Sequence, residues 1–315
     1  MVSAFVSSGL IGNMFRDRKV AEAFSDQVFV GKMLAFERAW SASLVEVGRI
    51  ETSDGTAAIA VIDGFSPNFG ALRERTDRDG LPLPGLVAQL REGRPENIRA
   101  ALHSGATSQD VIDTATVLTC REILTDFTAR GQNCLMLLDR LNQQFGDAKM
   151  MGRTRMQAAL PMRVSDRLRS WRTPLRNHLD ALPALVQSLS QIQVGGPIGV
   201  RDVEIETIAA HVAKLLSLDL APVWHTDRTS FVSLGHWLML LSGSLGKIGM
   251  DITLMAQQGF DEIALDGAGG SSAMVHKQNP VRAEGLVTLA RYVAGQQGIL
   301  GQAMVHEQER SGMAW

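Results

Sequence analysis

One seam of apolar residues, spaced alternately three and four positions apart, constrains the fold of this chain more than any other feature. It comprises Val117, Cys120, Leu124, Phe127, Gly131, Cys134, Leu138, Leu141 and Phe145. This spacing is typical of an α-helix that packs along its length against other helices. A helix over 117–145 is more than twice the mean length in globular proteins, which is about 11–12 residues. The seam therefore predicts a bundle of long helices, whose apolar faces often continue into neighbouring subunits.

Similar patterns predict further helices, over 16–50, 162–193, 202–218, 226–258 and 279–309. Pro174 and Pro183 are expected to kink or divide the second of these. Residues 51–99 contain many glycines and prolines, which predict shorter helices there. The sequence thus predicts an all-α fold of the long-helix bundle type. An N-terminal helical domain is expected over 1–100 and a central bundle domain over 101–315.

The charge and cysteine content excludes several classes of function. The chain has 315 residues, of which 45% are apolar and 20% charged, and its formal net charge is −2. Without a basic excess, nucleic acid is not an expected partner. Cys120 and Cys134 both fall on the seam, which favours buried thiols over a redox or metal role. Because we find no metal motif and no apolar run of membrane-spanning length, we expect a cytoplasmic protein that binds neither metal nor membrane.

A glycine-rich loop before the last predicted helix is the strongest candidate for chemistry. The glycines in 267–270 permit positive φ and close approach to a ligand. Ser271 and Ser272 follow, and then Lys277 and Asn279. A flexible linker would account for the glycines and serines but not for the lysine and asparagine. The spacing differs from that of a G-x-S-x-G nucleophile elbow and from that of a phosphate-binding P-loop.

Three other polar segments border the predicted helices. Thr107 and Ser108 stand at a helix start, where they could cap the helix or bind a carboxylate. Arg155 and Gln157 stand in a polar stretch between helices that is either a solvated loop or an anion site. In WHTDR, His225 is a candidate acid or base, although an isolated loop histidine is usually neither. Each segment taken alone favours the structural interpretation.

In their order along the chain, these segments resemble the three conserved regions of the fumarase/aspartase superfamily, which includes adenylosuccinate and argininosuccinate lyases. HSGATSQDVIDTA resembles the first region, and GRTRMQAALP resembles the second, typically G-R-T-H-x-Q-x-A-x-P. GSSAMVHKQNP resembles the signature G-S-S-x-M-P-x-K-x-N-P. The resemblance covers nearly the whole chain and implies a homotetramer with active sites shared between subunits, and no cofactor. The superfamily's third, C-terminal helical domain is expected to be short or missing.

Two residues depart from the superfamily pattern. Val275 replaces the proline of the signature, and Arg155 replaces the histidine of the second region, which belongs to the acid/base system of the lyases. The cycloisomerase branch of the superfamily lacks that histidine, and PVWHTDR and SGSLGKIGMDITLM also resemble this branch. The resemblance therefore implies lactonisation of a small tricarboxylate. It implies that 3-carboxy-cis,cis-muconate closes to 4-carboxymuconolactone in the β-ketoadipate pathway of aromatic-compound breakdown.

The resemblance also implies roles for individual residues. Ser271 is the expected proton-transfer residue, Ser272 is its alternative, and Lys277 would help to stabilise the serine alkoxide. The residues expected to bind substrate carboxylates are His103, Thr107, Ser108, Arg155, Gln157, Asn279 and, as a weaker candidate, Arg228. Three alternatives stay open: a fumarate-releasing lyase of the same superfamily, a relative acting on a sulfonated muconate, and a helical scaffold without activity.

Overall fold

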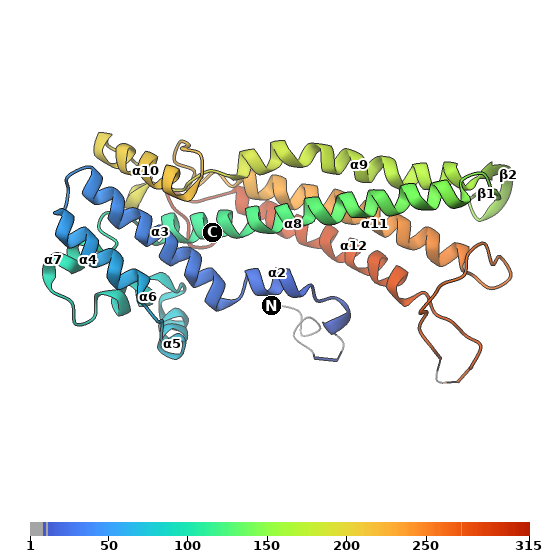
Figure 1. The fold of residues 1–315 in the computed structure, drawn as a ribbon, viewed down its shortest axis with the longest axis horizontal. Coiled ribbons are helices and arrows are strands. Elements are labelled where there is room, and N and C mark those ends of the chain that lie inside the picture. The colour runs from blue at the N-terminus through green and yellow to red at the C-terminus, as the bar shows by residue number, and fades with distance from the viewer. Residues whose placement is uncertain (1–8, 11, 272) are drawn as a thin grey trace. The chain divides into compact units, whose positions relative to one another are not determined.

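The computed structural model describes residues 9–10, 12–271 and 273–315. Helices dominate it, so the predicted all-α class is confirmed (Figure 1). In chain order the elements are η1 (Gly12–Met14), α2 (Arg18–Ala23), α3 (Asp26–Glu46), α4 (Thr52–Asp63), α5 (Phe69–Asp79), α6 (Leu83–Arg91), α7 (Glu96–Ala101), α8 (Ser108–Phe145), β1 (Lys149–Thr154), β2 (Gln157–Arg163), α9 (Val164–Leu189), η2 (Gly196–Ile198), α10 (Val203–Leu216), α11 (Thr229–Met255), α12 (Val281–Leu300) and η3 (Gly301–Met304).

The chain forms two compact units, each assembled from separate stretches of sequence. We call the first the bundle unit; it contains Met1–Asp17, Thr125–Leu185 and Thr229–Ala303. We call the second the head unit; it contains Arg18–Leu124, Val186–Arg228 and Met304–Trp315. These units are defined by compactness alone, and the boundary expected near residue 100 stays a prediction.

Helices α11 and α12 pack closely along each other in the bundle unit. Two glycines on α11 permit this approach: a Cβ at Gly249 would lie 2.5 Å from the carbonyl oxygen of Ala283, and one at Gly246 would lie 2.6 Å from the Cβ of Ala290. A core cluster joins α8, α9 and α11 through Leu135, Leu138, Leu168, Trp171, Leu175, Ile248 and Met255. The long helix predicted from the apolar seam is therefore confirmed as α8, which is continuous from Ser108 to Phe145.

Two of the long helices differ from their predicted form. Helix α9 continues through Pro174 and Pro183 and is not divided by them. Its buried leucines, among them Leu175 and Leu182, pack in the interior and offset the backbone hydrogen bonds that the prolines remove. Helix α12 ends at Leu300 and not near residue 309, in a region where glycines recur and helix propensity is low.

Helix α11 is long and apolar enough to cross a membrane by composition alone, with a mean hydropathy of 1.3 over an 18-residue window. The expectation that no apolar run reaches membrane-spanning length was wrong. Glycines and serines interrupt the apolar residues of α11, but the mean hydropathy of the helix stays high. Core helices of bundles have the same composition. Leu234, Trp237, Ile248 and Met255 of α11 are buried against other helices, so this is weak evidence for a membrane span.

The core of the head unit is centred on α3, which packs against α4 and α10. Met33, Phe36, Trp40 and Leu44 lie along one face of α3 and are fully buried. Phe36 and Trp40 stack with their ring centroids 5.7 Å apart. Ser25 caps the helix by accepting a hydrogen bond from the backbone N–H of Val28.

The segment GRTRMQAALP forms a β-hairpin and not a loop. Strands β1 and β2 are antiparallel, and Thr154 pairs with Gln157 across a turn made of Arg155 and Met156 only. Both turn residues have positive φ, 50° and 67°, which is the pattern of a type I′ turn. Such turns strongly favour Asn-Gly, and the Arg-Met sequence here carries no such signal. Sequence reasoning therefore missed the strands.

Both cysteines are free, and burial raises the pKa of each thiol, that of Cys120 to about 11. At pH 8 only about one Cys120 thiol in a thousand is then ionised, and the thiolate is the reactive form. We expect Cys120 in a Cys134→Ser variant to react with iodoacetamide far more slowly in the native state than in urea. Equal native and unfolded rates would contradict this expectation.

Candidate active site

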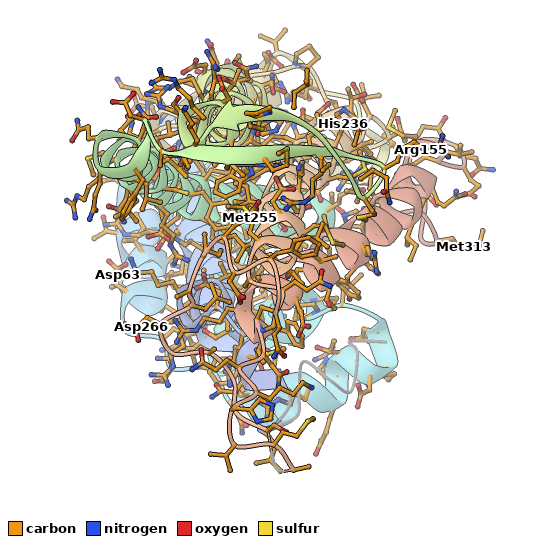
Figure 2. The ribbon with its side chains drawn as sticks, turned by 90° about the vertical axis from the view of Figure 1, so that its right-hand side faces the viewer. Asp63, Arg155, His236, Met255, Asp266 and Met313 are labelled. Atoms are coloured by element: carbon orange, nitrogen blue, oxygen red, sulfur yellow. The ribbon has the colours of Figure 1, made fainter. Side chains whose placement is uncertain are left out.

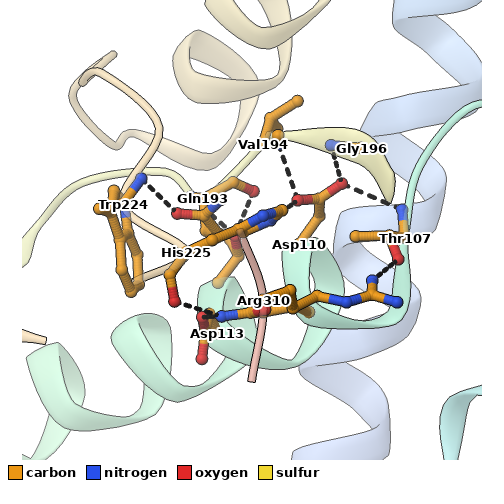
Figure 3. A network of polar contacts seen from close by, with 12 residues as sticks. Thr107, Asp110, Asp113, Gln193, Val194, Gly196, Trp224, His225 and Arg310 are labelled. Atoms are coloured by element: carbon orange, nitrogen blue, oxygen red, sulfur yellow. Dashed lines mark hydrogen bonds and ion pairs between the residues drawn. The ribbon is translucent and has the colours of Figure 1, made fainter. Parts of the chain in front are cut away.

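The first turn of α8 contains a buried carboxylate, that of Asp110, which joins three separate segments of the head unit (Figure 3). Its Oδ1 accepts a hydrogen bond from the backbone N–H of Gly195 at 2.8 Å and lies 2.9 Å from Nε2 of His225. Its Oδ2 accepts from the backbone N–H groups of Gly196 at 3.1 Å and Thr107 at 3.0 Å. Asp110 thus fixes the backbone around the predicted carboxylate site.

A second buried carboxylate, that of Asp113, lies one helical turn further along α8. It accepts two hydrogen bonds from the guanidinium of Arg228, at 2.7 and 2.9 Å. Gln109 and the indole of Trp315 also donate to it, at 3.2 and 2.9 Å. The Arg228 guanidinium lies 5.3 Å from the centre of the Trp224 ring. Arg228, expected to be a weak substrate-binding candidate, therefore has its charge matched by a buried protein carboxylate.

Thr107 and Ser108 stand at the N-terminus of α8, as the sequence predicted. The hydroxyl of Thr107 accepts a hydrogen bond from the Arg310 guanidinium, so a cation from the C-terminal segment lies beside the predicted carboxylate site. The positive end of the helix dipole, the hydroxyls and this guanidinium together favour an anion. Arg310 was not predicted from the sequence.

His103 precedes this helix start and has a left-handed backbone, with a φ of 55°. Its Nδ1 lies 2.7 Å from Oε1 of Glu37, whose side chain is fully buried on α3. A carboxylate bonded to one ring nitrogen fixes the orientation of the ring and leaves the other nitrogen, Nε2, for a ligand. Glu37 is an acidic residue on the apolar face of α3, and this pattern in the sequence could have identified it.

The base of the loop 267–280 lies in the bundle unit and is closed by backbone pairing. Gly269 and Asn279 exchange two backbone hydrogen bonds, of 2.9 and 2.7 Å. The side-chain amide of Asn279 also donates to the carbonyl of Gly270 at 3.2 Å. Asn279, expected to bind substrate, therefore also holds the two sides of the loop together.

The apex of the same loop carries the candidate proton-transfer residue. The hydroxyl oxygen of Ser271 accepts hydrogen bonds from the backbone N–H groups of Ala273 at 3.3 Å and Met274 at 3.2 Å. Ser272, the alternative, lies outside the described residues. Lys277 is exposed, and Val275 is fully exposed, so both project from the loop. Backbone donors directed at a serine oxygen are what an alkoxide there would require.

The hairpin and the loop lie at the same end of the bundle unit (Figure 1). Arg153 of β1 connects the hairpin to the segment that follows α11, because it pairs with Glu262 at 2.5 Å and lies 4.6 Å from the centre of the Phe260 ring. Figure 2 looks at this end and shows Arg155 of the turn and Asp266 at the start of the loop on different sides of it. Gln157 and Arg155 are both exposed.

The candidate residues are divided between the two units. Thr107 and Ser108 stand at the first turn of α8, in the head unit. The hairpin with Arg155 and Gln157 and the loop 267–280 belong to the bundle unit.

The lyase family model matches residues 17–295 of this chain. The chain belongs to the lyase family. The three segments thus correctly predicted a fumarase/aspartase-type lyase. Over 98% of its length, this lyase is 32% identical to a 3-carboxy-cis,cis-muconate cycloisomerase from Acinetobacter baylyi, covering 71% of that protein. It is 28% identical to trans-aconitate decarboxylase 1 from Mycosarcoma maydis, covering 64% of that protein.

A solved structure supports the same relationship. The 3-carboxy-cis,cis-muconate lactonizing enzyme from Pseudomonas putida superimposes on this lyase with a TM-score of 0.89 at 32% identity. The alignment covers 98% of this lyase and 71% of that enzyme. The chain therefore spans 64–71% of the length of these relatives.

Proposed function

We propose that this member of the lyase family is a cycloisomerase that converts 3-carboxy-cis,cis-muconate to 4-carboxymuconolactone. The observation that carries the proposal is Arg155, a permanent cation at the exposed hairpin turn where lyases of the superfamily have an acid/base histidine. A cation there suits a tricarboxylate and cannot exchange a proton near neutral pH. Relatives with this named activity, at about 32% identity, support the same substrate class.

The proposed reaction needs no external nucleophile. A carboxylate oxygen of the substrate adds to the conjugated double bond, which forms one C–O bond and breaks one C=C π bond. The electron pair moves to the carbon α to another carboxylate, and Ser271 delivers a proton to that carbon. The serine alkoxide is stabilised by the N–H groups of Ala273 and Met274 and by Lys277, and regains a proton from water. Proximity contributes strongly because the reacting groups share one molecule.

Assembly into a homotetramer with shared sites is part of the proposal. Apolar side chains remain exposed on the bundle helices, among them Met136, Leu137, Phe145, Tyr292 and Ile299. Such surfaces favour association of helices between subunits. Association of this kind would bring the α8 start of one chain to the loop and hairpin of others, in a cytoplasmic enzyme that uses no cofactor.

Ultraviolet absorbance with 3-carboxy-cis,cis-muconate tests the activity, because lactonisation destroys the conjugated diene. Loss of the diene signal without fumarate formation is the expected result. Fumarate release from adenylosuccinate or argininosuccinate would select the lyase alternative. No change with any polycarboxylate would select the inactive scaffold.

Replacing Arg155 with histidine is expected to raise KM about 10–100-fold with a smaller change in kcat. A hydrogen bond to a charged group contributes about 1.5–3 kcal/mol, which corresponds to this range. The Arg163→His variant, at the far end of the hairpin, is the control and should keep its KM. If Arg155→His instead released fumarate from a succinyl substrate, the assignment to the cycloisomerase branch would be wrong.

A further inference from the structure

A cavity of about 860 Å³ lies within the head unit, between α5, α6, α7 and the segment before α8. Its lining is rich in cations: Arg75, Arg91 and Arg99 contribute three guanidinium groups, and Glu92 contributes one carboxylate. His103 and Ser108 also line it. Low-dielectric walls around charges of one sign concentrate the field within a cavity, so this one attracts anions.

The three arginines differ in what neutralises them. Arg75 has Asp79 at 3.6 Å, and Arg99 has Glu96 at 3.4 Å. Arg91 forms no ion pair with any residue that the structure describes. Its side chain is held in place because one terminal nitrogen donates to the carbonyl of Leu102 at 2.5 Å. A fixed guanidinium without a carboxylate partner is preorganised for an added anion.

The Nε of Arg91 is also buried and has no hydrogen-bond partner among the described residues. Leaving a buried donor unpaired costs about 1–3 kcal/mol, more for a charged group. Because Nε is closed to solvent, an oxyanion in the cavity would accept from the terminal nitrogens of the guanidinium and not from Nε.

His103 supplies a second polar group to the same cavity. Buried Glu37 holds its Nδ1 at 2.7 Å, and no described residue bonds to its Nε2. Within the part of the chain that the structure describes, Oε2 of Glu37 has no hydrogen-bond partner, so the imidazole of His103 is the one side-chain group that bonds to this carboxylate. The pair fixes the imidazole at the cavity wall, one residue after the carbonyl that anchors Arg91.

We infer that this cavity is a binding site for an oxyanion group of the substrate, a carboxylate or a phosphate, bound by the terminal nitrogens of Arg91 and oriented by His103. Arg91 lies outside the three segments of the resemblance, whereas His103 and Ser108 of the first segment also line the cavity. The inference rests on the proposed function in one respect: it takes the bound anion to be part of the substrate, because Ser108 belongs both to this cavity and to the predicted carboxylate site at the start of α8. Binding itself requires no turnover, so it is measured separately.

Calorimetric titration of the full-length protein with tricarballylate, a saturated tricarboxylate that cannot react, tests the site. In Arg91→Ala we expect the Kd to rise at least tenfold. Arg94→Ala is the matched control, because Arg94 is an exposed arginine of the same turn that does not line the cavity, and its Kd should stay unchanged. The Arg91→Lys variant keeps the positive charge but lacks the planar guanidinium, so its Kd should lie between those of the wild type and Arg91→Ala. If Arg91→Ala does not fold, Arg91→Lys takes its place in the test.

A Kd for tricarballylate that is the same in wild type, Arg91→Ala and Arg91→Lys would overturn the inference. A parallel titration with inorganic phosphate distinguishes the two oxyanions. Arg91-dependent binding of phosphate but not of tricarballylate would support the site and contradict the cycloisomerase. Arg91-dependent binding of tricarballylate, without lactonisation of 3-carboxy-cis,cis-muconate, would also support the site while the proposed function fails.

Discussion

The Ser271→Ala variant is expected to lose activity by about 10²–10⁴-fold in kcat, the usual contribution of a positioned proton donor. The loss should appear in the lactonisation rate with little change in KM, because the proposed role of the hydroxyl is to deliver a proton to the substrate carbon and not to bind the substrate. The free energy of unfolding should change by less than about 0.5 kcal/mol, since the loop is exposed and, among the described residues, the Ser271 hydroxyl bonds to the backbone of its own turn.

The comparison variant for this prediction is Ser272→Ala, which should keep most of the rate. Both variants are assayed by loss of diene absorbance, and both are unfolded in urea to verify the fold. Near-normal turnover in Ser271→Ala, with a loss in Ser272→Ala, would transfer the proton-transfer role to Ser272. Near-normal turnover in both would remove this loop from the chemistry.

The Arg228→Ala variant is expected to lose about 3–5 kcal/mol of unfolding free energy, because it leaves the carboxylate of Asp113 buried without its counter-charge. Both side chains of this pair are at most 9% exposed. Gln109 and Trp315 would still donate to Asp113, which limits the loss but cannot replace a bidentate guanidinium. Urea unfolding measures the change.

The control is Arg73→Ala, which removes an arginine from an exposed pair with Asp26. An exposed pair contributes about 0–1 kcal/mol, so this variant should be nearly as stable as the wild type. If Arg228→Ala kept its stability and raised KM instead, Arg228 would bind substrate, as the sequence resemblance first implied.

Local patterns in the sequence predicted the helices better than anything else in the fold. The seam from Val117 to Phe145 specified α8, because three–four spacing is a property of one helix and needs no distant partner. The hairpin was missed because Arg155 and Met156 carry no turn signal and strand pairing depends on context. The path of α9 through its prolines was missed because packing overrides local propensity.

In the candidate site too, features set by neighbouring residues could be predicted and features set by distant residues could not. The serine, lysine and asparagine of the loop could be proposed as site residues because they are close together in the sequence. The partners of the site were not found, because they are distant along the chain. Glu37 lies 66 residues from His103, Arg153 lies 109 from Glu262, and Asp113 lies 115 from Arg228. Arg91 was missed because its place in the cavity wall, without an ion pair among the described residues, can be seen only in the three-dimensional structure.

The two residues of the hairpin turn, Arg155 and Met156, destabilise the fold of the hairpin, although one of them is proposed to bind substrate. Arg155 and Met156 both hold left-handed backbone, which costs about 1–2 kcal/mol for each residue that is not glycine. The side chain of Met156 is 72% exposed, so its packing within this chain offsets little of this backbone strain. Selection for thermostability alone would replace this pair with Asn-Gly and would thereby remove the cation proposed to bind substrate. Engineering of a heat-resistant form should therefore leave these two positions unchanged and begin elsewhere.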